Sequence, residues 1–223
     1  MTPVQNIEQA RFNMVEQQIR TWDVLNQEIL DLLYRIHRED FVPEAYRSLA
    51  FCDLEIPLGE APGERMWAPR MEARVLQELK LKRSESVLEV GTGSGYLCAL
   101  LSQCAGRVVS VDISSRLAKL GETNLAAQGI DNAIVEVGDA ALGWPKKAPY
   151  DVIVLTGSVP VLPASLLDQL KPGGRMFAIV GDAPVMSARM ISKNSSSAIH
   201  QDEMFETCAA PLDNAQQPVR FQF

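Results

Sequence analysis

A short apolar run followed by three glycines at alternate positions constrains the fold of this chain most. Residues 87–90 form the run, and Gly91, Gly93 and Gly95 follow it. An apolar run of this length is typical of a strand buried in a parallel sheet. The glycines predict a turn whose backbone passes very close to a ligand, because a Cβ there would collide with it. A helix expected over residues 97–103 directs its free N–H groups at the same place, so we expect a nucleotide-type site.

Strand and helix patterns alternate from residue 86 onward. Further strands are expected over residues 108–111, 133–137, 150–155 and 175–181, and helices over residues 115–128 and 163–170. This alternation predicts an α/β fold with a doubly wound, mostly parallel sheet. Residues 187–193 and 203–212 are expected to supply two terminal strands, and Ser158 is expected in a turn.

The N-terminal third is expected to be a helical extension of this core. Residues 7–50 show helical spacing of apolar positions, and Asn26 is placed to cap the second helix. Residues 51–70 are expected to form a long loop that acts as a lid or binding segment, before a helix over residues 71–81. We therefore expect N-terminal helices and a substrate loop over residues 1–83, and a ligand-binding core with C-terminal strands over residues 84–223, in one domain overall.

Composition excludes several classes of function. The 223-residue chain is 47% hydrophobic and carries a formal net charge of −7, which argues against nucleic acid as a partner. No run of eighteen apolar residues predicts a membrane span, and the N-terminus lacks a signal-peptide pattern. Four cysteines without pairing motifs predict reduced thiols and a cytoplasmic protein: Cys52, Cys98, Cys104 and Cys208. His37 and His200 lie near no cysteine pair, so no metal site is expected.

The glycine spacing and one acid indicate which nucleotide binds. The pattern is Gly-x-Gly-x-Gly, whereas dinucleotide-binding loops read Gly-x-Gly-x-x-Gly beneath a pyrophosphate. Glu89 is the one acid in the run over residues 87–90 and lies two positions before Gly91. A carboxylate there would repel a diphosphate but suits an ammonium group. The ligand is therefore expected to be S-adenosylmethionine, with its methionine amine held by Glu89.

Two further strand ends fit the rest of that cofactor. Asp112, followed by Ile113, ends the second strand and can accept hydrogen bonds from both ribose hydroxyls. Gly138, Asp139 and Ala140 follow the third strand, where the adenine is expected. Either aspartate alone would more often be a helix cap or a turn residue. Together with the glycines, they favour one cofactor crevice.

Other pieces of the sequence carry a resemblance to a known family. They are Phe41-Val42-Pro43, Glu55-Ile56-Pro57-Leu58-Gly59, Gly143-Trp144-Pro145, Ala148-Pro149-Tyr150-Asp151 and Gln169-Leu170-Lys171-Pro172-Gly173-Gly174-Arg175. With the glycine loop, they resemble the protein-L-isoaspartate O-methyltransferase family of class I methyltransferases, over residues 10–215. The resemblance implies a Rossmann-like fold, S-adenosylmethionine as methyl donor, and methylation of the free α-carboxyl of isoaspartyl residues in a protein or peptide. Such chemistry would repair aged protein.

A carboxylate acceptor agrees with the sparse supply of bases in the sequence. A carboxyl group with a pKa of roughly 4 is already ionised at neutral pH, so it needs no general base. Holding its oxygen in line with the methyl group can supply roughly 7–11 kcal/mol of the barrier. No catalytic residue is assigned from the sequence.

The chain departs from the family pattern in the expected loop. The family reads Gly-Gln-Thr-Ile-Ser-Gln-Pro, and its serine grips the acceptor carboxylate. Here Arg65 stands at the threonine position and Trp67 at the serine position, with Pro69 fixing the alignment. Arg65, Trp67, Pro69 and Pro160 are expected to line the acceptor side. Trp67 either fills the acceptor space or packs as a lid over the cofactor. The first possibility leaves open a different acceptor or a cofactor-binding protein without catalysis.

Overall fold

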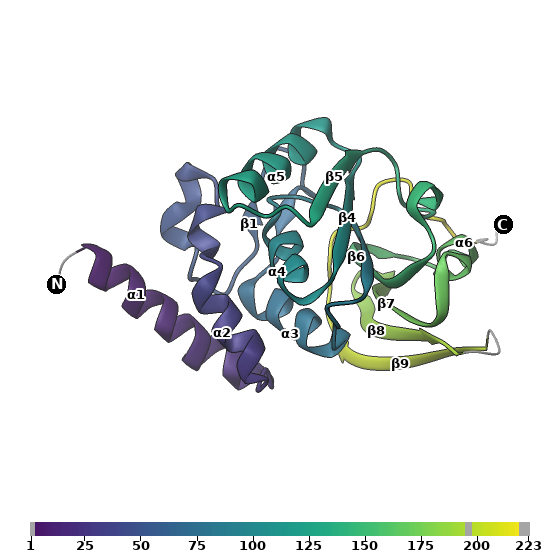
Figure 1. The fold of residues 1–223 in the computed structure, drawn as a ribbon, viewed down its shortest axis with the longest axis horizontal. Helices are drawn as coiled ribbons and strands as arrows, with labels where there is room; N and C mark the ends of the chain where they lie inside the picture. Colours follow the sequence, from purple (N-terminus) through teal and green to yellow (C-terminus); the bar gives the residue numbers. More distant parts are fainter. Residues whose placement is uncertain (1–2, 195–197, 219–223) are drawn as a thin grey trace.

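The computed structural model describes residues 3–194 and 198–218, and over these residues it forms a seven-stranded sheet (Figure 1). The strand order is β5-β4-β3-β6-β7-β8-β9. The bounds are β3 (Ser86–Val90), β4 (Arg107–Asp112), β5 (Ala133–Val137), β6 (Tyr150–Val159), β7 (Leu170–Asp182), β8 (Val185–Lys193) and β9 (Ile199–Glu206). The strands β3 to β7 pair in parallel, and β8 and β9 add an antiparallel end. The predicted α/β fold with a mostly parallel sheet is confirmed.

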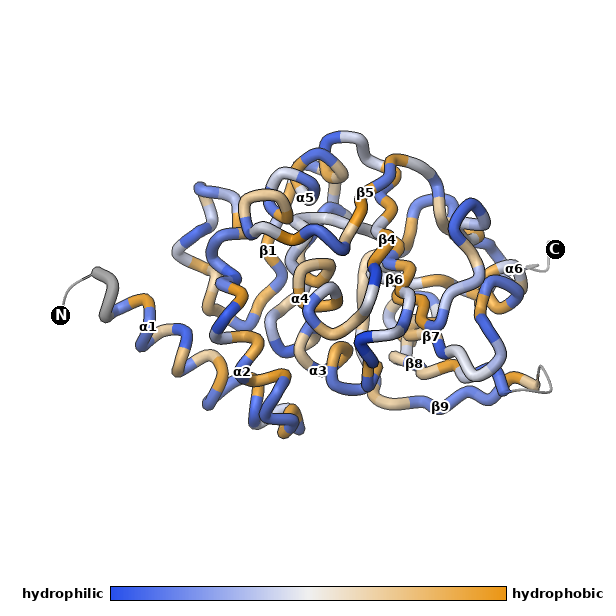
Figure 2. The backbone as a smooth tube through the Cα atoms, in the orientation of Figure 1, coloured by the Kyte–Doolittle hydropathy of each residue, from blue (hydrophilic) through white to orange (hydrophobic). Residues whose placement is uncertain are grey.

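Alternate residues of the central strands face two separate apolar layers. Val87 of β3 belongs to the layer that also contains residues of α2 (Gln27–Arg35), α3 (Pro69–Leu79), α4 (Tyr96–Cys104) and α5 (Ser115–Ala127). Leu88 faces the other layer, which contains Leu166 of α6 (Ala164–Asp168). This alternation follows from the twofold period of a strand. Helices on both faces therefore bury the strands, and Figure 2 shows the hydrophobic segments gathered there.

The N-terminal extension is helical but irregular. It begins with α1 (Pro3–Asn13), which lies at the outer edge of the molecule in Figure 1, and continues through a π-helical turn over Met14–Ile19. Three 3-10 helices also belong to it: Arg20–Trp22, Arg38–Asp40 and Glu44–Leu49. Asn26 caps α2 as predicted, because its Oδ1 accepts hydrogen bonds from the backbone N–H groups of Glu28 (2.9 Å) and Ile29 (3.4 Å).

The expected long loop is confirmed with one addition. Residues 51–68 contain only a two-residue antiparallel ladder, β1 (Ile56–Pro57) with β2 (Arg65–Met66), and α3 begins at Pro69, two residues before the expected start. The division of the chain at residue 83 stays a prediction. No helix among the described residues is long and apolar enough to cross a membrane.

Two expectations for the C-terminal part are wrong. The last strand is expected over residues 203–212, but β9 spans Ile199–Glu206, and the chain beyond it bridges to Ser158 of β6 at Pro211 instead of extending the ladder with β8. Ser158 was expected in a turn, but it is a buried residue of β6. Its N–H donates to the Ala210 carbonyl (2.9 Å), and its carbonyl accepts from the Leu212 N–H (2.9 Å). We call residues 209–215 the C-terminal strap.

Candidate functional site

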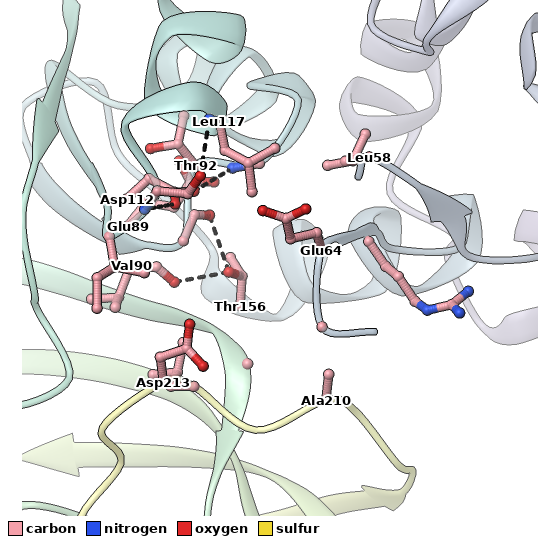
Figure 3. A pocket seen from close by; sticks show the side chains of 18 of the residues that line it. Leu58, Glu64, Glu89, Val90, Thr92, Asp112, Leu117, Thr156, Ala210 and Asp213 are labelled. Carbon is pink, nitrogen blue, oxygen red and sulfur yellow. Dashed lines mark hydrogen bonds between the residues drawn. The ribbon is translucent and has the colours of Figure 1, made fainter. Parts of the chain in front are cut away.

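A cavity of about 320 Å³ opens at the carboxyl ends of the central strands. Its walls come mainly from the glycine loop, residues 111–114 after β4, residues 138–141 after β5, the residue 55–67 region and the C-terminal strap. Residues 156–157 of β6 and single residues of α3, α4 and α5 also line it. Figure 3 shows Glu64 opposite Thr92 and Asp112, with Asp213 and Ala210 of the strap on another side. The cavity lies where β3 pairs with β4 on one side and β6 on the other. Open α/β sheets bind ligands at such a switch point.

The glycine loop brings backbone directly against β6. Gly91 has a φ of +98°, and a Cβ built on it would lie 2.0 Å from the Thr156 hydroxyl oxygen. That hydroxyl donates to the carbonyl oxygens of Val90 (2.8 Å) and Gly91 (3.0 Å). Glycine is therefore required at this position by both conformation and space. Gly91 and Gly93 line the cavity, whereas Gly95 lies behind them as the N-cap of α4.

Glu89 offers one unpaired carboxylate oxygen within this frame. Its side chain is 0% exposed, and its Oε2 accepts a hydrogen bond from the hydroxyl of Ser110, which lies opposite it on β4. Its Oε1 is buried and has no hydrogen-bond partner among the described residues. Burial raises the pKa of Glu89 to about 8. Hydrogen bonds from Ser110 and Cys98 oppose that rise, and the negative charges of Asp112 and Glu72 add to it. A buried orphan carboxylate oxygen suits a cationic N–H donor, so Glu89 fits an ammonium group.

Asp112 is held by the backbone around it. Its oxygens accept hydrogen bonds from the N–H groups of Gly93 (2.9 Å) and Ser114 (2.9 Å). Burial raises the pKa of this carboxyl, and the backbone donors oppose that rise. Each oxygen keeps a further lone pair for a ligand hydroxyl. Ile113, which is 45% exposed, lines the cavity beside it. Both residues fit the ribose part of the predicted cofactor.

The predicted adenine end is built around Asp139. Its Oδ1 accepts from the Ala141 N–H (3.0 Å), and its Oδ2 accepts from the Asn214 side-chain amide (2.8 Å). A Cβ on Gly138 would lie 2.5 Å from the Trp144 ring. The Trp144 indole therefore leaves room only for a glycine at position 138. Gly138, Asp139 and Ala140 all line the cavity. Their contacts with adenine stay predictions.

The structure brings two of the four predicted acceptor-side residues to the cavity. Trp67 is 7% exposed, and its ring packs edge-on against Phe177 with ring centres 6.2 Å apart. Arg65 is exposed, and its Nε donates to the Pro62 carbonyl (3.0 Å). Pro69 is instead the first residue of α3, and Pro160 follows the end of β6. Neither proline lines the cavity, so their predicted roles remain untested.

A buried ion pair behind Trp67 was not predicted. Arg38 pairs with Glu72 of α3, and its guanidinium also donates to the Trp67 carbonyl (2.6 Å) and the Ala50 carbonyl (3.0 Å). Glu72 itself lines the cavity. Burial raises the pKa of Glu72 to about 7, against the opposite effect of Arg38. One signal could have revealed it, because Glu72 shares the apolar face of α3 with Val75 and Leu79.

The C-terminal strap was also missed as a wall of the site. Residues 210–213 line the cavity, and Leu212 packs against Gly157, where a Cβ would lie 2.8 Å from the leucine Cδ2. The Ser158 hydroxyl donates to the Ala209 carbonyl (3.0 Å). Nothing local in the sequence of residues 209–215 indicates that they return to β6.

Three comparisons place the chain among known proteins. The family model "Protein-L-isoaspartate(D-aspartate) O-methyltransferase (PCMT)" matches residues 9–217. A protein-L-isoaspartate O-methyltransferase from Brucella anthropi is 33% identical over 210 residues, which cover 94% of this chain and 95% of that protein. A solved protein-L-isoaspartate O-methyltransferase has a TM-score of 0.78 at 26% identity, over 90% of this chain and 65% of that longer chain. A Plasmodium falciparum structure solved with S-adenosyl-L-homocysteine has the same fold, with a TM-score of 0.76 at 19% identity over 90% of this chain and 97% of that one.

Proposed function

The chain belongs to the protein-L-isoaspartate(D-aspartate) O-methyltransferase family, and on that premise we propose that it is an S-adenosylmethionine-dependent O-methyltransferase of isoaspartyl carboxylates. The resemblance found in the motifs is thereby confirmed. The observation that carries the proposal in this chain is the orphan Oε1 of Glu89 inside a glycine-lined cavity. It is a buried carboxyl oxygen without a partner, and an ammonium group bound against it would favour its ionised form.

The other cofactor contacts follow from the lining of the cavity. Asp112 has lone pairs free for the ribose hydroxyls, and we assign Asp139, which also lines the cavity, to the exocyclic amine of adenine. The backbone at Gly91 and Gly93 leaves room for the methionine part. When bound, S-adenosylmethionine supplies an electrophilic methyl group. The chain's own task is then to orient the acceptor and to exclude water.

Arg65 is the residue best suited to hold the acceptor carboxylate. Among the described residues that line the cavity, it is the one basic side chain. A guanidinium can bind a carboxylate through two parallel hydrogen bonds. The acceptor is ionised at neutral pH and needs positioning rather than a base. Arg65 thus takes the part of the family serine, whose position Trp67 occupies.

The product of this reaction is a methyl ester, and its collapse to a succinimide makes the chemistry one of protein repair. The partner is a protein or peptide with a damaged residue. We further propose a cytoplasmic location, which the free thiols of all four cysteines support. A different acceptor or a non-catalytic role rests on Trp67 alone, and the family match does not favour either.

A labelling experiment tests the proposal. The protein is incubated with methyl-labelled S-adenosylmethionine and an isoaspartyl peptide, alongside the matching aspartyl peptide. Label is expected on the isoaspartyl peptide alone. Label on neither peptide, with S-adenosylhomocysteine binding intact in calorimetry, would contradict the proposed activity.

Two variants locate the acceptor site. Arg65→Met is expected to raise KM for the isoaspartyl peptide at least tenfold, because it removes a charge-assisted bidentate contact. Arg83→Met is the matched control, since Arg83 is exposed and does not line the cavity. Trp67→Ser restores the family hydroxyl. Increased isoaspartyl turnover would show that this position limits acceptor access, whereas equal KM values for the two arginine variants would exclude Arg65 from the site.

A further inference from the structure

A second cavity of about 350 Å³ lies on the other side of Trp67. Trp67 and Glu55 line both cavities, so one wall separates the second cavity from the proposed methyl-transfer site. We call the second one the side cavity. Its other main lining residues are Trp22, Asp53, Leu54, Arg70, Met71 and Glu206.

An aromatic ring in the wall of the side cavity already contacts a cation. The Arg70 guanidinium lies 4.8 Å from the centre of the Trp22 ring. The same guanidinium pairs with Asp53 at 2.8 Å, so its charge is neutralised within the chain. An aromatic face with an adjacent carboxylate is a favourable environment for lysine and arginine side chains. Trp67 and Met71 extend this apolar surface toward the cofactor cavity.

Two carboxylates of the side cavity remain without such a partner. Neither Glu55 nor Glu206 forms an ion pair with a basic side chain in the part of the chain that the structure describes. Burial raises the pKa of Glu55, and the positive charge of Arg65 offsets only part of that rise. The lining therefore holds three carboxylates, Asp53 included, against the one guanidinium of Arg70. A second positive charge would be attracted here, and a further negative charge would be repelled.

We propose that the side cavity binds the basic side chain of a lysine or arginine next to the isoaspartyl residue in the acceptor. This inference rests on the proposed function, because the isoaspartyl carboxylate must lie in the cofactor cavity. The shared wall of Trp67 and Glu55 then places a neighbouring side chain of the same peptide at the side cavity. The protein selects damaged sites beside basic residues.

Peptide competition tests the inference. Three isoaspartyl peptides differ only in the residues flanking the isoaspartate, which are lysine, glutamine or glutamate. The lysine peptide is expected to show a kcat/KM about three- to tenfold above the glutamine peptide, with the glutamate peptide lowest. Separate peptides with lysine on one side only identify which neighbour enters the cavity.

Charge changes at Glu206 provide the control within the protein. Glu206 lines the side cavity but not the cofactor cavity. Glu206→Gln is expected to reduce the lysine preference, and Glu206→Lys to shift it toward the glutamate peptide. Glu203→Gln changes an exposed carboxylate on the same strand outside the side cavity and is expected to leave the preference as it was.

The outcomes separate this inference from the proposed function. Equal kcat/KM for the three peptides, with label still entering the isoaspartate, overturns the inference and leaves the methyltransferase assignment intact. A lysine preference that persists in Glu206→Lys also overturns it. Absence of label on every peptide contradicts the proposed function itself.

Discussion

The two ends of the cofactor cavity are built in different ways. At the end proposed for the cofactor, each important carboxylate lies at a strand end or directly after one, as Glu89 in β3, Asp112 in β4 and Asp139 after β5. At the acceptor end, Trp67 is held by Arg38 from 29 positions away, and the wall is completed by the C-terminal strap. The first end is fixed by the sheet edge. The second depends on contacts between segments distant in sequence.

The largest expected effect tests whether one buried arginine holds the acceptor end. Arg38→Met leaves Glu72 as an uncompensated buried carboxylate, so the free energy of unfolding is expected to fall by about 3–5 kcal/mol. Urea denaturation at pH 8 measures it, because that pH lies above the pKa of about 7 that Glu72 has beside Arg38, so the variant must either bury the charge or take up a proton.

Arg20→Met is the control for that change. Its ion pair with Glu16 is partly exposed, with side-chain exposures of 33% and 31%, and lies within one helical region, so its loss is expected to cost less than about 1 kcal/mol. Similar costs for the two variants would show that the buried pair does not support the Trp67 wall.

Glu89→Gln tests the cofactor end. The change keeps the shape of the side chain but removes its charge, so S-adenosylhomocysteine is expected to bind about 10- to 100-fold more weakly, which corresponds to about 1.5–3 kcal/mol. Calorimetry measures the dissociation constant. Glu122→Gln, at an exposed carboxylate paired with Lys119, is expected to bind as the parent does. If Glu89→Gln also binds normally, the ammonium lies elsewhere.

The pH dependence of S-adenosylhomocysteine binding further tests whether Glu89 binds the ammonium group. Because burial raises the pKa of Glu89 to about 8, its carboxyl is mostly protonated in the free protein at pH 6. An ammonium ligand requires the ionised form, so affinity is expected to rise by about tenfold per pH unit from pH 6 toward 8 and then level off. In Glu89→Gln, affinity is expected to be nearly independent of pH. In Glu72→Gln, affinity is still expected to rise toward pH 8.

The Glu89 carboxyl affects the stability of the free protein with the opposite pH dependence. Its folded pKa lies above the ordinary value of 4.5, so the folded state retains a proton that the unfolded state releases. Its contribution to the stability of the free protein is therefore expected to decline as pH rises from about 4.5 to about 8. A parent protein whose affinity for S-adenosylhomocysteine does not change between pH 6 and 8 would refute the elevated pKa.

The smallest expected effect on cofactor affinity concerns Asn214, which connects the C-terminal strap to Asp139. Asn214→Ala removes the hydrogen bond from the strap to Asp139. Because that bond is exposed, S-adenosylhomocysteine binding is expected to weaken only about two- to fivefold. Gln216→Ala, exposed and outside the cavity lining, is the matched control. A loss as large as that of Glu89→Gln would mean that the strap, rather than the sheet edge, governs cofactor affinity.

Most of the features that could be predicted from the sequence lie at the cofactor end, and those that could not lie at the acceptor end. Asn26, the apolar run before Gly91 and the acids at the strand ends are local signals, since each depends on neighbours within a few positions. The strap is not local, because Ala210 and Leu212 pair with Ser158 some 50 residues earlier. Ser158 itself resembled a turn residue between Gly157 and Pro160. Only the pairing of its backbone reveals a strand. Glu72 was overlooked because helical spacing identifies a buried face but not the partner that a charge on it requires.

The return of residues 209–215 to β6 has a consequence for synthesis. A nascent chain on the ribosome can pair β3 to β7 as soon as those strands emerge, yet the cavity still lacks a wall. Only after the strap has emerged can Ser158 and Asp139 find their partners. The cavity therefore gains its C-terminal wall, and with it the hydrogen bond from Asn214 to Asp139, only after residues 209–215 have left the ribosome.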